Sequence, residues 1–375
     1  MSLTLLHTAD WQLGKRFANV PGDAGAALRL QRLKSVEAIA HLARERQVDA
    51  VLVAGDVFDD NAVSDETLRR TVHALTAFDG PWVLLPGNHD AALAESVWTR
   101  LRRLDIVPGN LILADRPEPI PLCDGRLVVL PAPLQRRHDS RDLTAWFDTC
   151  ETPPDVFRVG LAHGAVSNRL PERAESMNPI ADDRALTARL DYLALGDWHG
   201  TLEIAERSWY AGTPEPDRFR ANDPGNVLLV DLTAPGEAPK VDKIRVGRYR
   251  WRQEAFEILD ESSLEVLRDR LAALEAPADT LLRLKLKGAL SLAMREALDE
   301  LLADWRARFH YLEVDESELA ARPTPEDIEA LGATGFVREA VERLQAIEAD
   351  PSSEDREAAA LALQILYLTQ KEVQG

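Results

Sequence analysis

The stretch VDAVLVAGDVFDD, residues 48–60, decides how the fold is interpreted. Val and Leu fill its first half, and Gly55 and Asp56 follow the apolar run directly. An apolar run that ends in Gly and Asp is typical of a buried strand with polar side chains at its carboxyl end. We therefore predict a strand over Val48–Asp56, with functional residues where this strand gives way to the next helix.

Similar strands and helices alternate on both sides of this stretch. The other short runs rich in Val and Leu are Leu3–Asp10, Pro81–Asn88, Arg126–Pro131, Val156–His163 and Tyr192–Gly196. Helical periodicity lies between the first strands, over Ala27–Gln47, over Asp65–Phe78 with Ser64 as N-cap, and over Ala91–Leu104. This alternation predicts an α/β sandwich, in which ligands gather at the carboxyl ends of the strands.

The rest of the chain changes pattern twice. Residues 226–252 are β-rich and would complete a second sheet. A small α/β module is predicted next, from the strand Glu254–Leu259, the helix Ser263–Leu274, the strand Leu281–Lys287, the helix Leu292–Phe309 and the strand Tyr311–Val314. Two helical segments follow, Val337–Ala349 and Ser353–Lys371. We predict a large α/β domain over residues 1–252, a small α/β domain over residues 253–320 and a C-terminal helical segment over residues 321–375.

Composition limits the classes of function. The net charge is -19, and residues 251–375 hold 27 acidic and 14 basic residues, so the acidity is concentrated in the last third. Binding of phosphates normally requires surplus Lys and Arg, so this charge permits a polyanionic substrate without predicting one. Two cysteines are too few for a disulfide framework, no basic and apolar leader precedes Leu3, and apolar runs such as Ala358–Leu363 are too short for a membrane span. We expect a cytoplasmic protein with no membrane role.

The ends of the predicted strands carry the residues that point to chemistry. They read TADWQLG, AGDVFDD, PGNHD, LAHG and LGDWHG, and the donors they offer are Asp10, Gln12, Asp56, Asn88, His163, Asp197 and His199. Carboxylate, amide and imidazole groups without sulfur suit hard to borderline divalent cations rather than a thiolate zinc site. Seven donors are more than one octahedral ion needs. Two ions that share a carboxylate would use them all, and such a pair is typical of phosphoester hydrolysis.

These blocks, in this order, resemble the calcineurin-like metallophosphoesterases. The segments GDVFDD, GNHD, LAHG and YAGTPEPDRF are most similar to the DNA-repair branch around the SbcD nuclease. The resemblance covers residues 1 to about 250. It implies a metallophosphoesterase sandwich of two β-sheets flanked by helices, followed by a capping domain and C-terminal helices.

The resemblance also implies roles for individual residues. Asp56 would be the carboxylate that bridges two ions. The first metal site would be completed by Asp10, Gln12 and His199, and the second by Asn88, His163 and Asp197. His89 would face the substrate and stabilise the transition state or protonate the leaving oxygen, with the Asp59 carboxylate orienting it. Phosphate contacts are expected from basic residues in two loops, namely Lys15, Arg16, Arg218 and Arg220.

Two positions depart from the usual family pattern. The first block is commonly Asp-x-His, where this chain has Gln12, and the last is commonly Gly-His-x-His, where this chain has Asp197. Loss of metal binding is one interpretation. Both replacements still offer oxygen, however, and would shift the preference from zinc toward manganese or magnesium. Trp11 and Trp198 alternate with these donors, and either core packing or base stacking would suit them.

The resemblance extends to a bacterial group of stand-alone repair enzymes called MPE. It implies a manganese-dependent DNA nuclease, an endonuclease on single strands, with exonuclease action left open. A phosphodiesterase or phosphatase for a nucleotide or other small phosphoester is the alternative enzyme, and a metal-poor scaffold is the alternative outside enzymes. An intramolecular contact, a homodimer or an SbcC-like ATPase partner would suit the apolar C-terminal residues Leu361, Leu363, Ile365, Leu366 and Leu368.

Overall fold

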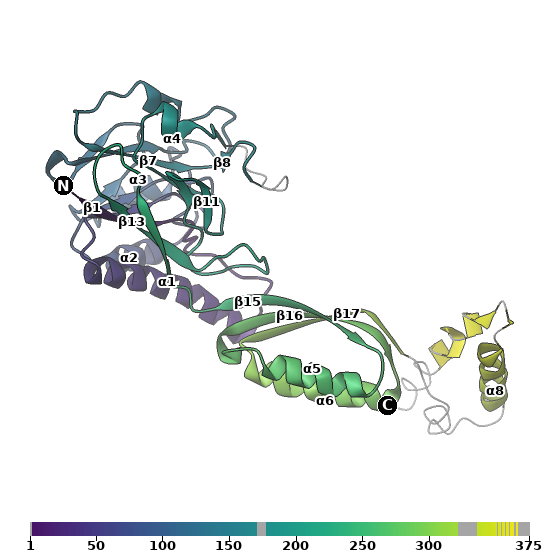
Figure 1. Ribbon diagram of the computed structural model, residues 1–375. Helices are drawn as coiled ribbons and strands as arrows, with labels where there is room; N and C mark the ends of the chain where they lie inside the picture. The colour runs from purple at the N-terminus through teal and green to yellow at the C-terminus, as the bar shows by residue number, and fades with distance from the viewer. Residues whose placement is uncertain are drawn as a thin grey trace. The chain divides into compact units, whose positions relative to one another are not determined.

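The computed structural model describes residues 2–170, 178–321 and 336–350, together with residues 352, 353, 355, 356, 358, 359, 361–363, 365 and 366. The chain divides into two compact units, Met1–Arg250 and Trp251–Gly375 (Figure 1). Within the described ranges, no helix has both the length and the apolar character that a membrane crossing requires. The division into three domains stays a prediction.

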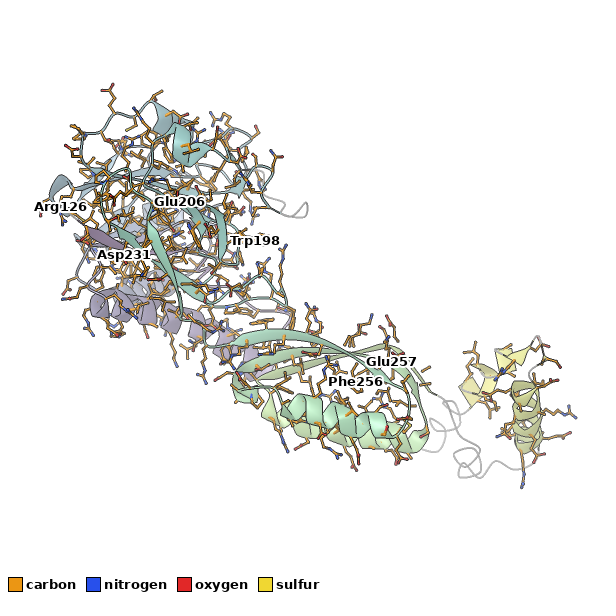
Figure 2. All side chains as sticks on the ribbon, in the orientation of Figure 1. Arg126, Trp198, Glu206, Asp231, Phe256 and Glu257 are labelled. Carbon is orange, nitrogen blue, oxygen red and sulfur yellow. The ribbon has the colours of Figure 1, made fainter. Side chains whose placement is uncertain are left out.

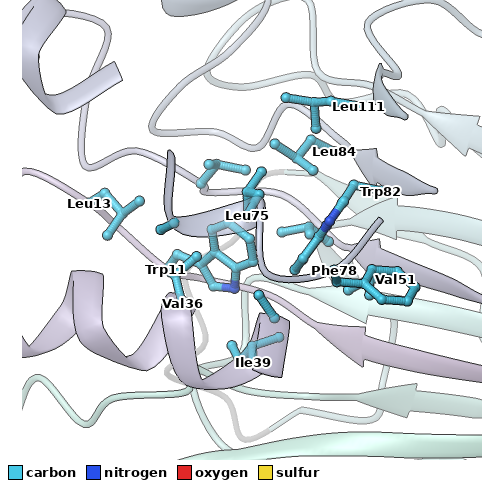
Figure 3. Packing of buried hydrophobic residues seen from close by; sticks show 14 of the residues in the cluster. Trp11, Leu13, Val36, Ile39, Val51, Leu75, Phe78, Trp82, Leu84 and Leu111 are labelled. Carbon is cyan, nitrogen blue, oxygen red and sulfur yellow. The ribbon is translucent and has the colours of Figure 1, made fainter. Parts of the chain in front are cut away.

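The first sheet of the larger unit has six strands in the order β14-β13-β1-β2-β3-β4. The parallel strands are β1 (Leu3–Thr8), β2 (Ala50–Val53), β3 (Trp82–Leu84) and β4 (Leu111–Leu113). The helices α1 (Gly22–Glu45), α2 (Asp65–Leu75) and α3 (Val97–Arg103) alternate with them. Figure 3 shows Val36 and Ile39 of α1 packing with Val51 of β2 and Trp82 of β3 in one buried cluster.

The second sheet has the order β11-β12-β10-β7-β6-β5. Its strands are β5 (Ile120–Leu122), β6 (Leu127–Ala132), β7 (Phe157–His163), β10 (Tyr192–Gly196), β11 (Leu202–Ala205) and β12 (Ser208–Tyr210). Short elements complete this half, namely η1 (Cys123–Gly125), η2 (Ala145–Asp148), β8 (Ala165–Val166), β9 (Pro179–Ile180) and α4 (Arg184–Thr187). The central pairs β6·β7 and β7·β10 are parallel, so these strands end at the same edge.

The two sheets share a buried apolar layer. Leu5 and Leu52 from the first sheet belong to the same cluster as Val159 and Tyr192 from the second. Fully apolar strands such as β2 are expected where both faces are covered. The predicted α/β sandwich of two sheets flanked by helices is therefore confirmed.

Two details differ from the sequence prediction. The segment expected to complete a second sheet instead extends the first, because β13 (Asn226–Leu232) pairs antiparallel with β1 and β14 (Lys240–Arg245) pairs with β13. The helix expected over Ala91–Leu104 begins only at Val97, since Ser96 forms a capping box with Thr99. The N-cap predicted at Ser64 is confirmed, and its side chain accepts a hydrogen bond from the Thr67 N–H.

The second unit contains a three-stranded sheet, β15-β16-β17, with two helices on one face. Its elements are β15 (Arg250–Ile258), α5 (Ser262–Ala272), η3 (Pro277–Asp279), β16 (Thr280–Leu290), α6 (Leu292–Arg308) and β17 (Tyr311–Ala321). Phe256 packs into the apolar layer beneath the helices, whereas the next residue, Glu257, forms an ion pair with Lys287 at 3.2 Å (Figure 2). Successive side chains of a strand point to opposite faces, which explains the contrast.

The C-terminal segment includes α8 (Phe336–Ala349). Val341 of this helix and Leu363 are buried together, while Leu361 and Ile365 are exposed. Leu368 and the end of the predicted helix Ser353–Lys371 lie outside the described residues.

Candidate metal centre

Polar side chains from both sheets meet at the carboxyl ends of their strands. Asp10 follows β1, Asp56 follows β2 and His163 is the last residue of β7. One ligand atom from each of these three buried residues lies within 4.8 Å of the other two. The structure thus brings together three of the residues that the sequence placed at strand ends.

The loops that carry these residues adopt an unusual backbone. Asp10, Gln12, Asp56 and Asp197 have φ of 54°, 42°, 52° and 98°, in the left-handed region that side chains other than glycine rarely occupy. Backbone hydrogen bonds hold the first two loops together, from Asp10 N–H to Gly55 O at 3.0 Å and from Gln12 N–H to Asp56 O at 2.8 Å. Strain of this kind persists where surrounding contacts enforce it, and it concentrates at functional sites.

Two glycines allow the ligand loops to approach this closely. A Cβ on Gly87 would lie 2.2 Å from Asp56 Oδ1, and a Cβ on Gly55 would lie 2.2 Å from His163 Nδ1. Gly55 also has a φ of +88°. A side chain at either position would displace a proposed ligand, so these glycines are required by the geometry of the cluster.

His163 presents one defined nitrogen to the cluster. Its Nδ1 lies 2.8 Å from Ala54 O, and because a carbonyl only accepts, Nδ1 carries the hydrogen. Nε2 faces three oxygens, Asn88 Oδ1 at 2.9 Å, Asp56 Oδ1 at 3.5 Å and Asp197 Oδ1 at 3.7 Å. The imidazole is therefore oriented as a ligand or as a partner of carboxylates.

The electrostatics of the cluster suit a divalent cation. Burial raises the pKa of Asp10 to about 6. Burial alone would lower the pKa of His163, but the neighbouring carboxylates outweigh this effect and raise it to about 9. Asn88 Oδ1 lies 3.2 Å from both carboxylate oxygens of Asp56, an approach that is repulsive unless the amide turns or a cation lies among the oxygens. The donor set fits a divalent ion, which would offset this excess of negative charge.

Gln12 and His199 lie side by side at the edge of the cluster. Gln12 Nε2 is 3.4 Å from His199 Nε2, while Gln12 Oε1 accepts a hydrogen bond from Lys15 Nζ at 2.8 Å. Gln12 therefore turns its amide nitrogen, and not its oxygen, toward His199. Coordination through the oxygen, as expected from the sequence, requires the amide to rotate and to leave Lys15.

A further carboxylate near the cluster, Asp217, was not assigned from the sequence. Its side chain is 1% exposed and contacts Lys15 Nζ at 2.9 Å, Arg218 Nε at 2.9 Å and His199 Nδ1 at 3.3 Å. Although burial opposes it, His199, Lys15 and Arg218 hold the pKa of Asp217 well below its ordinary value. The block YAGTPEPDRF contains Asp217, but its own letters do not reveal which side chain turns inward.

A buried arginine on α1 was also missed. Arg32 is 2% exposed and donates to three carbonyl oxygens, Trp11 O at 2.6 Å, Asp10 O at 3.1 Å and Glu215 O at 3.1 Å. In the sequence it is one of several charged residues on an amphipathic helix. In the structure it ties the loop after β1 to the loop that carries Asp217.

His89 contacts Asp59 differently from the sequence expectation. His89 Nδ1 lies 2.8 Å from the backbone carbonyl oxygen of Asp59, whereas the Asp59 carboxylate faces Lys15 Nζ at 3.9 Å. The carbonyl can only accept, so Nδ1 donates and Nε2 is left toward the cluster, 3.9 Å from Asp56 Oδ2. Asp59 thus orients His89 through its main chain.

The predicted substrate-contacting residues lie in different settings. Lys15 is engaged by Gln12 and Asp217, and its side chain is 23% exposed. Arg16 and Arg218 are exposed, and exposed Arg220 stacks its guanidinium 4.6 Å from the ring of Trp198 (Trp198 is labelled in Figure 2). Their contacts with a substrate stay predictions.

The structure distinguishes between core packing and base stacking for Trp11. Trp11 is 1% exposed, packs among Val36, Leu75 and Trp82, and donates from Nε1 to Thr8 Oγ1 at 2.9 Å (Figure 3). It is a core residue. Trp198 is 9% exposed and also belongs to an apolar cluster, with Arg220 over its ring.

Comparisons with known proteins agree with this geometry. The family model described as calcineurin-like phosphoesterase matches residues 3–230. The chain is 26% identical over 268 residues to the DNA double-strand break repair protein Mre11 of Aeropyrum pernix, a match that covers 65% of this chain and 61% of that protein. It is 32% identical over 284 residues to the SbcD subunit of the nuclease SbcCD of Escherichia coli K12, covering 65% of this chain and 68% of that protein. The uncharacterized metallophosphoesterase YhaO of Bacillus subtilis is 22% identical over 315 residues, covering 81% and 73%.

Proposed function

Because the chain belongs to the calcineurin-like phosphoesterase family, we propose that it is a manganese-dependent DNA nuclease that cuts single strands internally. It would then resemble the stand-alone MPE group in activity. The observation that carries the proposal is the buried cluster of Asp10, Asp56 and His163 at the strand ends, in a chain whose relatives include a nuclease subunit and a DNA repair protein. The matched stretch covers less than two thirds of the Aeropyrum protein. The DNA substrate of this chain is therefore a proposal and is not transferred from that relative.

The residues that would hold the ions are those at the strand ends. Asp56 would be shared between two sites, the first completed by Asp10, Gln12 and His199, and the second by Asn88, His163 and Asp197. When bound, two divalent ions would lower the pKa of a water molecule and neutralise charge on a phosphodiester. The oxygen-rich donor set favours Mn²⁺, with Mg²⁺ as the alternative.

His89 supplies the proton chemistry in this proposal. Its Nδ1–H is held by the Asp59 carbonyl, so Nε2 is the atom that exchanges a proton with the substrate. The side chain is 30% exposed beside Asp56, which leaves it accessible to a phosphodiester. We assign to His89 the donation of a hydrogen bond or a proton to the oxygen that leaves phosphorus.

Polyanion binding is proposed for the basic residues around the cluster. Lys15 lies deepest, whereas Arg16, Arg218 and Arg220 are exposed and could meet phosphates of a strand. The exposed C-terminal side chain of Leu361 is the candidate contact for an SbcC-like ATPase or a second copy of the chain. A cytoplasmic location would agree with these roles.

Circular single-stranded DNA separates the leading proposal from its alternatives. Purified full-length protein is incubated with the circle and Mn²⁺, Mg²⁺ or Zn²⁺ in turn, and products are resolved on a denaturing gel. We expect linear and shorter strands with Mn²⁺. An intact circle together with turnover of a small phosphodiester would replace the nuclease by the small-substrate alternative, and absence of any divalent-ion binding would leave only the scaffold.

A further inference from the structure

Asp217 lies behind His199, on the side opposite the proposed ion. His199 Nε2 faces Gln12 and the cluster, while His199 Nδ1 faces Asp217 Oδ1 at 3.3 Å. The Asp217 side chain is only 1% exposed. A carboxylate at the far nitrogen of a histidine fixes the ring and determines which nitrogen carries the hydrogen.

The tautomer of His199 depends on which neighbour Nδ1 engages. A hydrogen on Nδ1 would be donated to Asp217, and Nε2 would keep a lone pair for an ion. Arg218 NH2 also lies 3.0 Å from Nδ1, and a hydrogen bond from this guanidinium would require the opposite tautomer. Arg218 is half-exposed, whereas the Asp217 carboxylate is buried and fixed, so Asp217 is the stronger determinant.

The loop that carries Asp217 is held in place by hydrogen bonds that do not involve the ion. Two residues before it, Glu215 accepts hydrogen bonds from Ser35 Oγ at 2.8 Å and from the backbone N–H of Tyr249 at 2.9 Å. Glu215 O also accepts from Arg32 of α1. This part of the loop is therefore anchored to α1 and to the segment before β15, which holds Asp217 in place beside His199.

We propose that Asp217 is a positioning residue that keeps His199 Nε2 free of hydrogen and directed at the first metal site. The proposal rests on the proposed function, because it assumes that His199 is a ligand there. Lys15 Nζ and Arg218 Nε each lie 2.9 Å from a carboxylate oxygen of Asp217 and help to hold this side chain in place. Asp217 acts through His199 and contacts no substrate.

The experiment measures Mn²⁺ binding by calorimetry to the full-length protein and to its Asp217→Asn variant. Asn keeps the shape of Asp, but its NH₂ group can donate to His199 Nδ1 and so stabilises the tautomer that cannot coordinate. We expect affinity at one site to fall about 10-fold to 100-fold while the other site stays unchanged. Asp139→Asn is the matched control, since Asp139 is also largely buried and paired with an arginine, Arg141, at 2.7 Å.

The outcomes separate this inference from the function on which it rests. Absence of Mn²⁺ binding to the wild-type protein would overturn both. Two ions on the wild type and unchanged affinities in Asp217→Asn would overturn the positioning role while the proposed function stands. Equal losses in Asp217→Asn and Asp139→Asn would likewise contradict a specific role for Asp217.

A second measurement needs no variant and so does not depend on whether one folds. Nitrogen-15 NMR of the neutral His199 ring in the metal-free wild-type protein reports which of its two nitrogens carries the hydrogen. We expect a protonated Nδ1 and a bare Nε2. A protonated Nε2 would overturn the proposal.

Discussion

At the scale of single residues, Lys15 determines which atom of Gln12 faces the candidate metal centre. Lysine only donates, so its 2.8 Å contact with Gln12 Oε1 withdraws the one atom of the amide that an ion could bind. The ammonium group also adds positive charge beside the cluster. In the proposed function, Lys15 would therefore compete with an ion at the first site, while offering a cation for a substrate phosphate.

Replacing Lys15 with Met should tighten Mn²⁺ binding. Removal of the ammonium frees Gln12 Oε1 and eliminates a repulsive charge, and we expect about tenfold higher affinity at one site, or about 1.4 kcal/mol. Calorimetry measures the change, with Lys243→Met as the control because Lys243 pairs with Asp223 on the surface. Weaker Mn²⁺ binding in Lys15→Met would show that Lys15 organises the ligands instead of competing with the ion.

His89→Ala should strongly slow strand cleavage without releasing metal. His89 contacts Asp59 O and lies 3.9 Å from the Asp56 carboxylate, and we assign it no bond to an ion. General acid catalysis typically contributes about 10²-fold to 10⁴-fold, so the rate should fall within that range. Metal analysis of the same sample is the check, and loss of an ion would mean that His89 is a ligand.

Residues differ in how far their placement could be predicted from the sequence. Asp10, Asp56 and His163 follow apolar runs directly, and the rule that parallel strands end at one edge places them together. Asp217 and Arg32 could not be found this way. The inward direction of Asp217 depends on the anchoring of Glu215, and the burial of Arg32 depends on loops distant in sequence that only the folded chain brings over α1.

At the scale of elements, α1 does more than cover the first sheet. Its apolar residues pack against the strands, while Arg32 reaches the carbonyl groups of two loops that border the cluster. Burial of a guanidinium is costly unless its donors are satisfied, and here three carbonyl oxygens and the Thr213 hydroxyl accept hydrogen bonds from it. The helix therefore couples stability to the geometry of the site.

Arg32→Met should destabilise the protein by about 3–5 kcal/mol, because three buried carbonyl oxygens lose their donor. Urea unfolding followed by circular dichroism measures the loss. Arg29→Met on the same helix is the control, since Arg29 is exposed and donates to a single carbonyl, and it should cost less than about 1 kcal/mol. Equal effects of the two substitutions would contradict a special role for Arg32.

Elements were predictable where periodicity and capping agree. The strand β7 and the helix α2 behind Ser64 lie close to their predicted positions. The position of β13 in the first sheet could not be predicted. It depends on long-range pairing with β1, and the local pattern of residues 226–232 contains no information about that pairing. Local rules thus identify a strand but do not choose its neighbours.

At the scale of the larger unit, His7 links the two sheets. It lies on β1, is fully buried, and its Nδ1 is 2.9 Å from the Tyr192 hydroxyl on β10. Burial lowers the pKa of His7 to about 3, against an opposing hydrogen bond to Leu195. The His7 imidazole is therefore neutral in the folded state over a pH range in which it is protonated in the unfolded chain.

The sign of the pH dependence follows from this difference. Between pH 6.5 and about 3, His7 is protonated in the unfolded state but neutral in the folded state. His7 therefore lowers the free energy of unfolding as pH falls, by about 1.4 kcal/mol per pH unit. Chemical unfolding of wild type and His7→Phe across this range isolates the contribution from other titrating groups. The stability curves should converge or cross on acidification, and parallel curves would contradict the assignment.

In the proposed function, the buried cluster binds two ions that share Asp56. Crystals of the full-length protein grown with Mn²⁺ and measured for anomalous scattering test it directly. We expect two peaks about 3.5–4 Å apart, one on each side of the Asp56 carboxylate, with His163 beside one and His199 beside the other. A single peak, peaks away from Asp56, or no anomalous signal at the cluster would contradict the two-metal phosphoesterase account.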